Sequence, residues 1–316
     1  MAQQTRIATV VPYYERFLAC FPDVRTLARA PLNDVLAGWS GLGYYRRAHH
    51  LHQSAQIIMK DFAGELPSDV EALQKLPGIG RYIAGAIASI AFNIPAPILD
   101  ANVARLFIRL YDLPDDLLVA KSREKLWRLV EIHVPPTNPR AFNEGIMELG
   151  ALVCALRSPA CPQCPLKRIC LARRRGTIQQ RPLRKKKPAV PTVHLNGAVI
   201  RRRDGAVLLL RNADRGLYAG LWSIPQYEAK TSNGAALTPP ISNLRVGLET
   251  TKKIGRVTHV LSHRKLALDL YAYRLLAVPR LPKSAFRWVR TNDNLRDLGV
   301  SSLTRKVLKA IFSPAR

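Results

Sequence analysis

Four of the five cysteines lie within 17 residues of one another, a spacing that suits metal–thiolate chemistry. They are Cys154, Cys161, Cys164 and Cys170, in the pattern C-x6-C-x2-C-x5-C. Four such thiolates can enclose a tetrahedral metal ion or a cubane iron–sulfur cluster. Structural zinc usually uses two well-separated C-x2-C pairs, and only one such pair is present. The fifth cysteine, Cys20, lies on an amphipathic helical pattern, where we expect a small core residue.

A Gly/Pro turn followed by an aspartate forms a second candidate site. The turn is Leu76-Pro77-Gly78-Ile79-Gly80, between two helical patterns, and Gly78 and Gly80 permit a tight turn there. Backbone N–H groups at the start of the next helix can hold a phosphate oxygen. Asp100, twenty residues beyond Gly80, opens a further helical pattern, where an aspartate most often serves as an N-cap.

The charge balance indicates a polyanionic partner. The 316 residues include 49 Lys and Arg against 22 Asp and Glu, a formal charge of +27. Such a protein is attracted to nucleic acid because each neutralised phosphate releases counterions. No run of 18 apolar residues occurs, and residues 1–14 lack the features of a secretion signal. We therefore expect a cytoplasmic protein without a membrane span, in which cysteines are metal ligands or free thiols.

The elements that must position these residues are helices in the first half. Six apolar residues at helical spacing predict one buried face of a first helix: Ile7, Val10, Val11, Tyr14, Phe17 and Leu18. Ser68-Asp69-Val70-Glu71 reads as a capping box that opens another helix. Helical patterns recur at about 82–92, 101–111, 122–134 and 141–156, without strand-like alternation.

The pattern changes after a basic stretch. Residues 173–187 contain eight basic residues and no acidic one, with prolines at 182, 188 and 191, which predicts an extended, positive linker over 173–191. Beyond it, 192–200 and 206–210 flank an Asp204-Gly205 turn and predict a β-hairpin. Residues 265–278 alternate in part, with Leu266, Leu268, Leu270 and Ala272 on one face, and 302–312 form a helical pattern. We predict domains at 1–172 and 192–316.

Together these motifs resemble the MutY family of adenine DNA glycosylases, members of the helix-hairpin-helix (endonuclease III) superfamily. The resemblance is carried by the cysteine spacing, the hairpin followed by Asp100, and three further segments: Gln3-Gln4-Thr5, Gly41-Leu42-Gly43-Tyr44-Tyr45 and 216–226 (GLYAGLWSIPQ). It implies an all-α helix-hairpin-helix glycosylase domain with a [4Fe–4S] cluster loop at 154–170. It also implies a C-terminal α+β Nudix-like domain that recognises the lesion. The Glu-rich Nudix catalytic box is absent, so this domain is expected to bind and not hydrolyse.

The resemblance also implies roles for individual residues. Asp100 would face the sugar, in an active site with Tyr82 and Asn102. Tyr82 stands where bifunctional relatives carry lysine, so no Schiff base can form and base excision without lyase chemistry is expected. The family usually has glycine where this chain has Ala101.

Other implied roles concern DNA. The residues implied to contact DNA or lesion are Gln3, Gln4, Tyr44, Gly78, Gly80, Ser262 and His263. Gln3 and Tyr44 would wedge into the duplex around an extruded adenine, while one of Tyr44 and Tyr45 is expected to be a core residue. Ser262 and His263 would sense 8-oxoguanine, with Leu261 where the family commonly has phenylalanine.

The expected function is removal of adenine opposite 8-oxoguanine or guanine in double-stranded DNA, by a monomeric, nucleoid-associated enzyme. The resemblance begins at Met1, and the family's general-acid glutamate falls before residue 1. Met1 is therefore expected to be either a mis-assigned start or a true truncation. The alternative function is a catalytically impaired protein that binds lesion-containing DNA. A third possibility, an endonuclease III-like enzyme for oxidised pyrimidines, is disfavoured by Tyr82 and the C-terminal domain.

Overall fold

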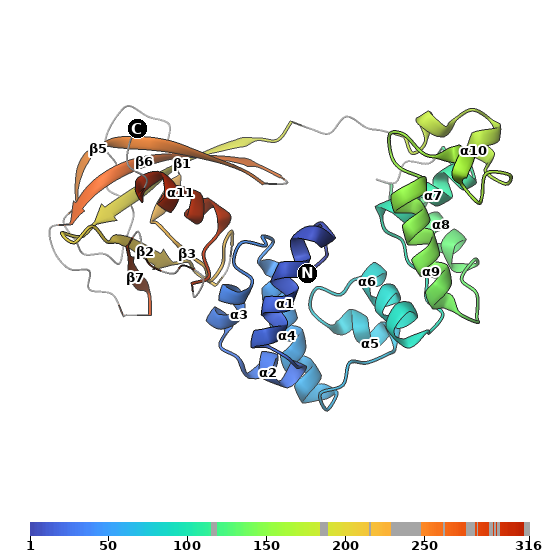
Figure 1. Cartoon of the computed structure of the whole chain (residues 1–316), viewed down its shortest axis with the longest axis horizontal. Helices are drawn as coiled ribbons and strands as arrows, with labels where there is room; N and C mark the ends of the chain where they lie inside the picture. Colours follow the sequence, from blue (N-terminus) through green and yellow to red (C-terminus); the bar gives the residue numbers. More distant parts are fainter. Residues whose placement is uncertain are drawn as a thin grey trace. The chain divides into compact units, whose positions relative to one another are not determined.

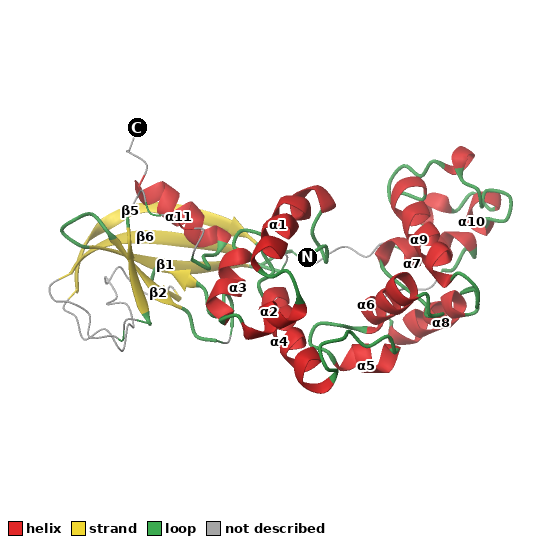
Figure 2. Ribbon diagram, turned by 60° about the horizontal axis from the view of Figure 1, so that its bottom comes forward, coloured by secondary structure: helices red, strands yellow, loops and turns green. Residues whose placement is uncertain are grey.

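Helices make up the first half of the chain and strands most of the second (Figures 1 and 2). The computed structural model describes residues 1–114, 119–183, 189–214, 216–228, 248–261, 263–275, 284–290 and 298–312, together with 282, 293 and 295. The chain forms two compact units, one comprising 1–56 with 188–316 and the other 57–187. The first unit thus groups the N-terminal helices with the C-terminal sheet. The predicted domains, 1–172 and 192–316, place these helices and this sheet in different domains.

Four helices build the N-terminal part of the first unit. They are α1 (Ile7–Cys20), α2 (Val24–Arg29), α3 (Leu32–Gly38) and α4 (Arg46–Asp61), and α4 continues into the second unit. Their core contains Phe17, Leu36 and Trp39, with the Phe17 and Trp39 rings edge to face at 5.8 Å. Leu221 of the C-terminal domain belongs to the same core. The helical block therefore closes its core with a residue from the other end of the chain.

The prediction of one wide buried face on α1 is wrong. Val10 and Phe17, two turns apart, are buried, whereas four residues of the predicted face are 40–65% exposed: Ile7, Val11, Tyr14 and Leu18. The buried stripe is narrow because α1 packs against α3 along one line. Cys20, the last residue of α1, is also exposed, so the prediction of a core cysteine is wrong as well. The periodicity indicates a helix correctly but cannot say how much of its apolar face a neighbour covers.

The second unit is helical throughout its described residues. Its α-helices are α5 (Val70–Lys75), α6 (Arg81–Ala86), α7 (Ala101–Leu110), α8 (Ala120–Glu131), α9 (Pro139–Glu148) and α10 (Leu171–Arg174). Two π-helical turns, η1 (Ile87–Ala91) and η2 (Leu149–Val153), extend α6 and α9, and 3₁₀ turns occupy η3 (Cys161–Gln163) and η4 (Ile178–Gln180). These elements confirm the helical patterns predicted from residue 82 to residue 156. Its core centres on α7 and includes Val103, Phe107 and Leu126.

The start of α5 corrects one sequence detail. Asp69 is the N-cap, and its Oδ2 accepts a hydrogen bond from the Ala72 N–H at 2.6 Å. The helix therefore begins one residue later than a capping box from Ser68 to Glu71 requires. An aspartate at the N-cap satisfies a free N–H of the first turn, so it can take the role of the serine before it.

The first part of the predicted linker is folded. Residues 171–180 contain α10 and η4. Asp112 anchors this segment through three contacts. Its Oδ1 accepts a hydrogen bond from Thr177 Oγ1 at 2.6 Å, and its carboxylate forms ion pairs with Arg175 at 3.1 Å and Arg181 at 2.9 Å. Asp112 adopts a left-handed conformation (φ +50°) just after α7, where it closes the helix with a Schellman pair of hydrogen bonds. The expectation of an extended segment is therefore wrong for 173–181, because one buried carboxylate neutralises and anchors part of the basic run. Residues 184–187 lie outside the described residues.

A seven-stranded mixed sheet forms the C-terminal domain. Its strands are β1 (Thr192–Arg201), β2 (Val207–Arg211), β3 (Trp222–Ser223), β4 (Gln226–Glu228), β5 (Leu248–Val260), β6 (Lys265–Leu275) and β7 (Phe286–Val289). The order β3-β2-β1-β6-β5 places β1 parallel to β6, with β4 on β1 and β7 on β2. β1 and β2 confirm the predicted hairpin. Residues 276–278 of the predicted alternating stretch lie outside the described residues.

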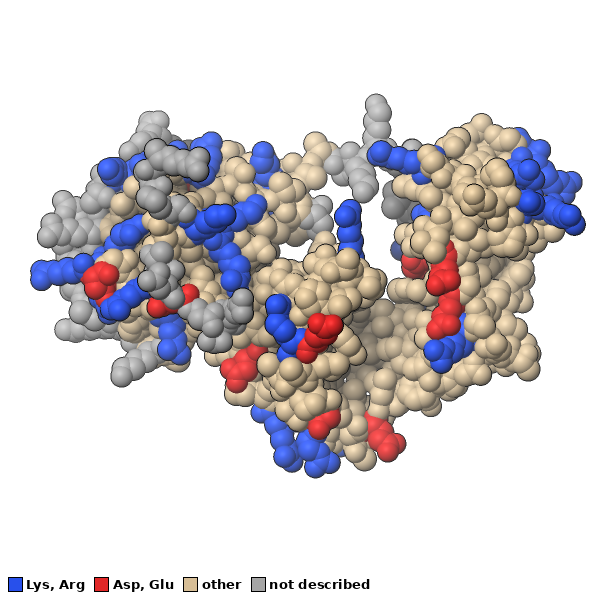
Figure 3. Space-filling model, viewed as in Figure 1, with Lys and Arg blue, Asp and Glu red and all other residues tan. Residues whose placement is uncertain are grey.

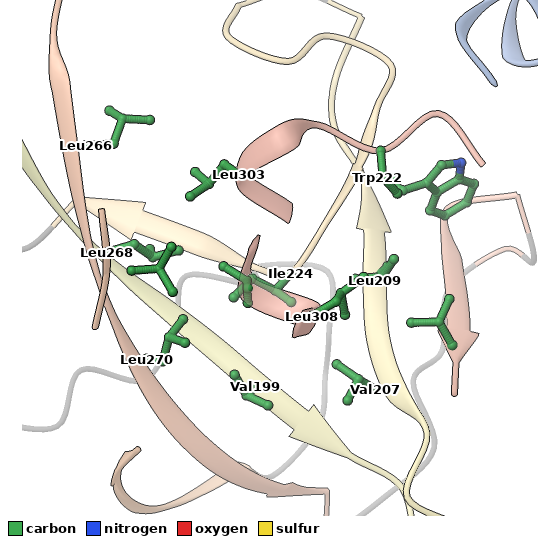
Figure 4. Close-up of a cluster of buried hydrophobic side chains, with 14 residues drawn as sticks. Val199, Val207, Leu209, Trp222, Ile224, Leu266, Leu268, Leu270, Leu303 and Leu308 are labelled. Carbon is green, nitrogen blue, oxygen red and sulfur yellow. The ribbon is translucent and has the colours of Figure 1, made fainter. Parts of the chain in front are cut away.

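One helix covers a face of this sheet. α11 (Ser302–Phe312) has the predicted bounds, and its Leu303 and Leu308 belong to the same buried cluster as Leu268, Ile224 and Leu209 of the sheet domain (Figure 4). The alternation of β6 is confirmed because Leu266, Leu268 and Leu270 are at most 2% exposed, while Ala272 is only partly buried. The result is an α+β domain with its own apolar core. Among the described residues, none of the helices is long and apolar enough to cross a membrane.

Replacing Asp112 tests the attachment of residues 171–181. In Asp112→Asn we expect trypsin to cleave after Arg173–Arg175 at least about tenfold faster, since a carboxylate between two guanidinium groups is lost. The Thr177 hydrogen bond and the two arginines lower the pKa of Asp112, so its stabilisation is present above the ordinary aspartate pKa and declines as pH falls below it. Asp34→Asn, an exposed helix aspartate, is the control. Equal cleavage rates in both variants would contradict the anchoring role.

Candidate active site and cysteine pocket

The predicted turn joins two short helices. α5 ends at Lys75 and α6 begins at Arg81, with Gly78 in the left-handed region (φ +79°) between them. Leu76 is 2% exposed, and its carbonyl accepts a hydrogen bond from the Ile79 N–H at 3.1 Å. Burial of Leu76 and this hydrogen bond stabilise the turn. Nothing lies within 4 Å of the place where a Gly80 side chain would be. The turn therefore presents open backbone at the start of α6, which suits approach of a phosphate.

Asp100 caps α7 and is held rigidly. Its Oδ1 accepts the backbone N–H groups of Asn102 (2.9 Å) and Val103 (2.7 Å), and its Oδ2 accepts the Asn102 side-chain Nδ2 (3.1 Å). These bonds satisfy free N–H groups of the first helical turn. They also fix both carboxylate oxygens, so that the negative charge stays at one place.

Tyr82 lies near this carboxylate. The pKa of its phenol is raised, first by burial and then by the negative charge of Asp100. Tyr82 is therefore neutral at physiological pH and packs against the core of the second unit. Asp100 and Asn102 are hydrogen-bonded to each other, and Tyr82 lies within the electrostatic reach of Asp100. The position that would carry an amine in a lyase carries a neutral hydroxyl.

A chain of hydrogen bonds leads from Asp100 to the cysteine segment. The Arg105 guanidinium donates to Asn102 Oδ1 at 2.9 Å, to the Gly150 carbonyl at 2.5 Å and to the Cys154 carbonyl at 2.7 Å. Asn102 thus donates to Asp100 and accepts from Arg105. Gly150 lies in η2, and this π-helical turn packs closely on α7. The packing therefore fixes the position of Asn102, and with it the position of Asp100.

A second buried arginine lies one turn along α7. Arg109, 1% exposed, donates to the carbonyls of Ala155 (2.8 Å), Leu156 (3.1 Å) and Arg181 (3.0 Å), and its Nη1 lies 3.5 Å from Cys154 Sγ. The bonded partners of Arg105 and Arg109 are carbonyl, amide and sulfur atoms, without a carboxylate among the described residues. Two buried cations are costly to remove from water. The negative charge of Asp100, reached through Asn102, favours the charged form of Arg105, and further negative charge beside Arg109 would lower the cost.

The four clustered cysteines line one small cavity. Cys154 is buried, Cys161, Cys164 and Cys170 are partly buried, and all four line a cavity beside Leu106 and Arg109. The pKa of Cys170 is raised, first by burial and then by the charges of the other three cysteines. Within the described ranges no three His, Cys, Asp or Glu side chains are placed to hold one metal ion. Four thiols that line one cavity beside two buried guanidinium groups are a set of ligands that could hold an anionic metal cluster.

Two further candidate residues meet in the first unit through Arg47. Its guanidinium donates to the Gln3 carbonyl and to Thr5 Oγ1 (3.1 Å), and lies over the rings of Tyr44 (5.3 Å) and Trp39 (5.4 Å). Tyr44 is 48% exposed while Tyr45 is 7% exposed, which confirms that one of the pair is a core residue. Arg47 therefore holds an exposed aromatic ring and the Gln3 segment side by side.

The remaining predicted residues lie in turns. Gln4 is exposed in a turn closed by the Thr5 N–H and the Ala2 carbonyl. His263 is exposed in the tight turn between β5 and β6, closed by the Leu261 N–H and the Arg264 carbonyl at 2.8 Å. Ser262 lies outside the described residues.

Basic side chains gather around α10, the end of the second unit that carries the cysteines (Figure 3). The exposed basic residues there are Lys167, Arg168, Arg173, Arg174 and Arg175. They lie on the cysteine segment, whose backbone carbonyls accept hydrogen bonds from the buried Arg105 and Arg109. Such a surface favours contact with phosphates.

Sequence reasoning missed Arg47, Arg105 and Arg109. For the last two a signal was present, because arginines four residues apart share one face of the otherwise apolar pattern 103–110. Charged residues on an apolar face must find partners, which points to a tertiary contact. Nothing local distinguishes Arg47 from the other basic residues of α4.

Comparison with known proteins agrees with this geometry. Residues 1–131 match the family described as HhH-GPD superfamily base excision DNA repair protein, and residues 196–310 match the NUDIX domain. The chain is similar to the structure of a thermostable thymine-DNA glycosylase, with a TM-score of 0.51 and 27% sequence identity. The match covers 55% of this chain and 80% of that protein. The fold and site therefore define a base-excision-repair DNA glycosylase of the helix-hairpin-helix class with a C-terminal Nudix domain.

The full-length relatives narrow this class. The adenine DNA glycosylase of Buchnera aphidicola subsp. Acyrthosiphon pisum is 32% identical over 310 residues, covering 98% of this chain and 87% of that protein. The adenine DNA glycosylase of Rattus norvegicus is also 32% identical and covers 98% of this chain and 69% of its own length. This chain belongs to the adenine DNA glycosylase (MutY) family. DNA is its partner.

Two glycines on the α9–η2 path test how tightly η2 packs on α7. A side chain on Gly150 would lie 2.9 Å from the Asn102 backbone, whereas one on Gly145 would meet nothing within 4 Å. We expect Gly150→Ala to lower the free energy of unfolding by about 1–3 kcal/mol. Gly145→Ala should raise it by roughly 0.5–1 kcal/mol because alanine favours the helix. Urea denaturation followed by circular dichroism measures both. A Gly150→Ala protein as stable as Gly145→Ala would contradict this packing.

Proposed function

We propose that this protein removes adenine mispaired with 8-oxoguanine or guanine, by hydrolysis of the N-glycosidic bond in double-stranded DNA, and acts as a monomer. The observation that carries the proposal is the rigidly held carboxylate of Asp100 beside the neutral phenol of Tyr82. The names of the relatives support adenine as the base. The preference for 8-oxoguanine in the opposite strand rests on the resemblance of the second domain.

The chemistry needs a fixed negative charge at the sugar. When the C1′–N9 bond breaks, its electron pair leaves with adenine, which takes up one proton, and positive charge develops on the sugar. A water oxygen then bonds to C1′; it keeps one hydrogen as the new hydroxyl and releases one proton, which balances the proton gained by adenine. A carboxylate that does not move during this step stabilises the oxocarbenium-like sugar. Three N–H donors hold Asp100 in place for that role. Because Tyr82 cannot form a Schiff base, water completes the reaction and the DNA strand stays intact.

We further propose that Cys154, Cys161, Cys164 and Cys170 hold a [4Fe–4S] cluster. Bound to four thiolates, the cluster would supply net negative charge and a covalent cross-link across the loop. Both fit the site, because Arg105 and Arg109 are buried beside it without a carboxylate partner. The loop so held carries exposed basic residues for phosphate contact.

The DNA-reading residues are proposed to act in the first unit. Tyr44 and the Gln3 segment, joined by Arg47, present a ring and amide groups that can fill the space of an extruded base. Ser262 and His263 would contact 8-oxoguanine, with His263 exposed between β5 and β6. Open backbone at Gly78 and Gly80 would hold a phosphate.

A second candidate function is binding of mispaired DNA without excision. The hydrogen-bond partners of Asp100 favour this function, because all of them are N–H groups of Asn102 and Val103 and none is a carboxylic acid. No second carboxyl group is bonded to Asp100 within the described parts of the chain. Adenine departure needs a proton from an acid, and loss of such an acid typically costs about 10²–10⁴-fold in rate.

The direct test is single-turnover cleavage of an A:8-oxoG duplex, with alkali revealing abasic product. For the wild-type chain we expect product. For Asp100→Asn we expect at least about 10²-fold slower excision with unchanged duplex affinity, since the amide keeps the cap but loses the charge. Asp69→Asn, which alters another capping aspartate, should retain full activity. Tight binding of A:8-oxoG duplex by the wild type without abasic product would favour the second candidate instead.

The cluster proposal is tested separately by iron content. Wild type, with the cluster reconstituted anaerobically, should bind about four iron atoms per chain with broad visible absorption. Cys164→Ser should lose most of this iron, whereas Cys20→Ser, at the exposed cysteine, should keep it. Zinc in place of iron, or equal iron in both variants, would rule the cluster assignment out.

A further inference from the structure

The segment between α3 and α4 has an unusual backbone. Gly41, Gly43 and Tyr44 all lie in the left-handed region, at φ +100°, +78° and +48°. A side chain on Gly41 would come within 2.5 Å of the Tyr13 hydroxyl, so only glycine fits there. A non-glycine residue such as Tyr44 is costly in this conformation and keeps it only where surrounding contacts fix it. The exposed Tyr44 ring is therefore held in a position that the local sequence does not favour.

Trp39 and Arg47 donate to the Gly43 carbonyl of this segment, and further contacts that fix it come from the C-terminal domain. The Tyr45 hydroxyl donates to the Val300 carbonyl at 2.9 Å and accepts the Gly41 N–H at 3.0 Å. Ser40 Oγ donates to the same carbonyl at 2.9 Å and accepts from Arg305 at 2.9 Å. We name these contacts of Ser40 and Tyr45 with Val300 and Arg305 the latch. Its partners are about 260 residues apart in the sequence.

Both sides of the latch are firmly embedded. Val300 is fully buried and bridges to Trp222 of β3, while the neighbouring Gly299 carbonyl accepts the Trp222 N–H at 2.9 Å. Leu36 of α3 packs closely on Gly299, where a side chain would come within 3.1 Å. Burial raises the pKa of Tyr45, so its hydroxyl keeps the proton that it donates. The latch is therefore a rigid connection between the loop 40–45 and the start of α11.

We propose that Ser40 and Tyr45 are positioning residues for base extrusion, which act by tying the Tyr44 loop to the lesion-reading domain. This inference rests on the proposed function, in which Tyr44 enters the duplex. Neither residue needs to touch DNA. The latch sets the distance between the inserted ring and the C-terminal domain, so that a lesion held by that domain and the base pushed out beside it are registered with each other. Free energy from lesion recognition can then assist extrusion.

Extrusion is measured by the fluorescence of 2-aminopurine placed next to the target adenine in an A:8-oxoG duplex. We expect Tyr45→Phe and Ser40→Ala each to lower the extrusion equilibrium at least about fivefold, because each removes two or more hydrogen bonds of the latch. Single-turnover excision should fall by the same factor. Affinity for undamaged duplex, which depends on phosphates, should stay the same. Ser40→Thr retains the hydroxyl and should restore extrusion, and Tyr14→Phe, at an exposed ring on α1, should leave it unchanged.

The two hydroxyls share one carbonyl, so the double variant adds a check. Ser40→Ala combined with Tyr45→Phe should lose less than the product of the single effects. Normal extrusion by folded Ser40→Ala and Tyr45→Phe, or an equal defect in Ser40→Thr, would overturn the latch while leaving the glycosylase proposal intact. Failure of the wild type itself to extrude adenine would overturn both. If Tyr45→Phe does not fold, the Ser40 pair carries the test alone.

Discussion

Burial of two guanidinium groups is the constraint on which the second unit depends. Arg105 and Arg109 lie four residues apart on α7 and donate into the carbonyls that surround Cys154. Each cation costs several kcal/mol to remove from water unless hydrogen bonds and opposite charge replace the lost hydration. The carbonyls supply the hydrogen bonds, Asp100 supplies part of the opposite charge to Arg105 through Asn102, and the proposed thiolate-bound cluster would supply more beside Arg109. The cofactor proposal thus follows from the electrostatics of α7 as much as from the spacing of the cysteines.

The ten-residue helix α7 therefore positions functional candidates at both of its ends and along one side. Asp100 caps its N-terminus, the two arginines hold the cysteine loop, and Asp112 at its C-terminus gathers the segment after that loop. A shift of the cysteine loop would be felt at Asp100 through Asn102, which bonds to both Asp100 and Arg105. Stability of the cysteine loop and placement of the Asp100 carboxylate are in this sense the same structural requirement.

Signals that are local in sequence predicted local structure well. Helical and strand periodicities located α7, α9, the β1–β2 hairpin and α11, because each pattern reflects a single element and the side it buries. The cysteine cluster was evident because all four residues lie within one segment of 17 residues. What failed depends on distant partners. The exposed face of α1, the exposure of Cys20 and the folding of 173–181 onto Asp112 are set by neighbours that no window of sequence contains. The same reason explains why Arg47 and the Ser40–Tyr45 contacts with Val300 escaped sequence reasoning.

The two units solve the problem of fixing a reactive group by different physical means. In the second unit a charged side chain is fixed by hydrogen bonds from its own helix, which a capping aspartate makes without long-range help. In the first unit an exposed ring sits on a strained loop, and strain of that kind persists only under contacts from elsewhere in the fold. A carboxylate that waits for charge to develop needs rigidity alone. In the proposed mechanism the Tyr44 ring enters the duplex in register with the C-terminal domain, which requires a connection between them. The carbonyl of one buried valine, bonded to Ser40 and Tyr45, is that connection.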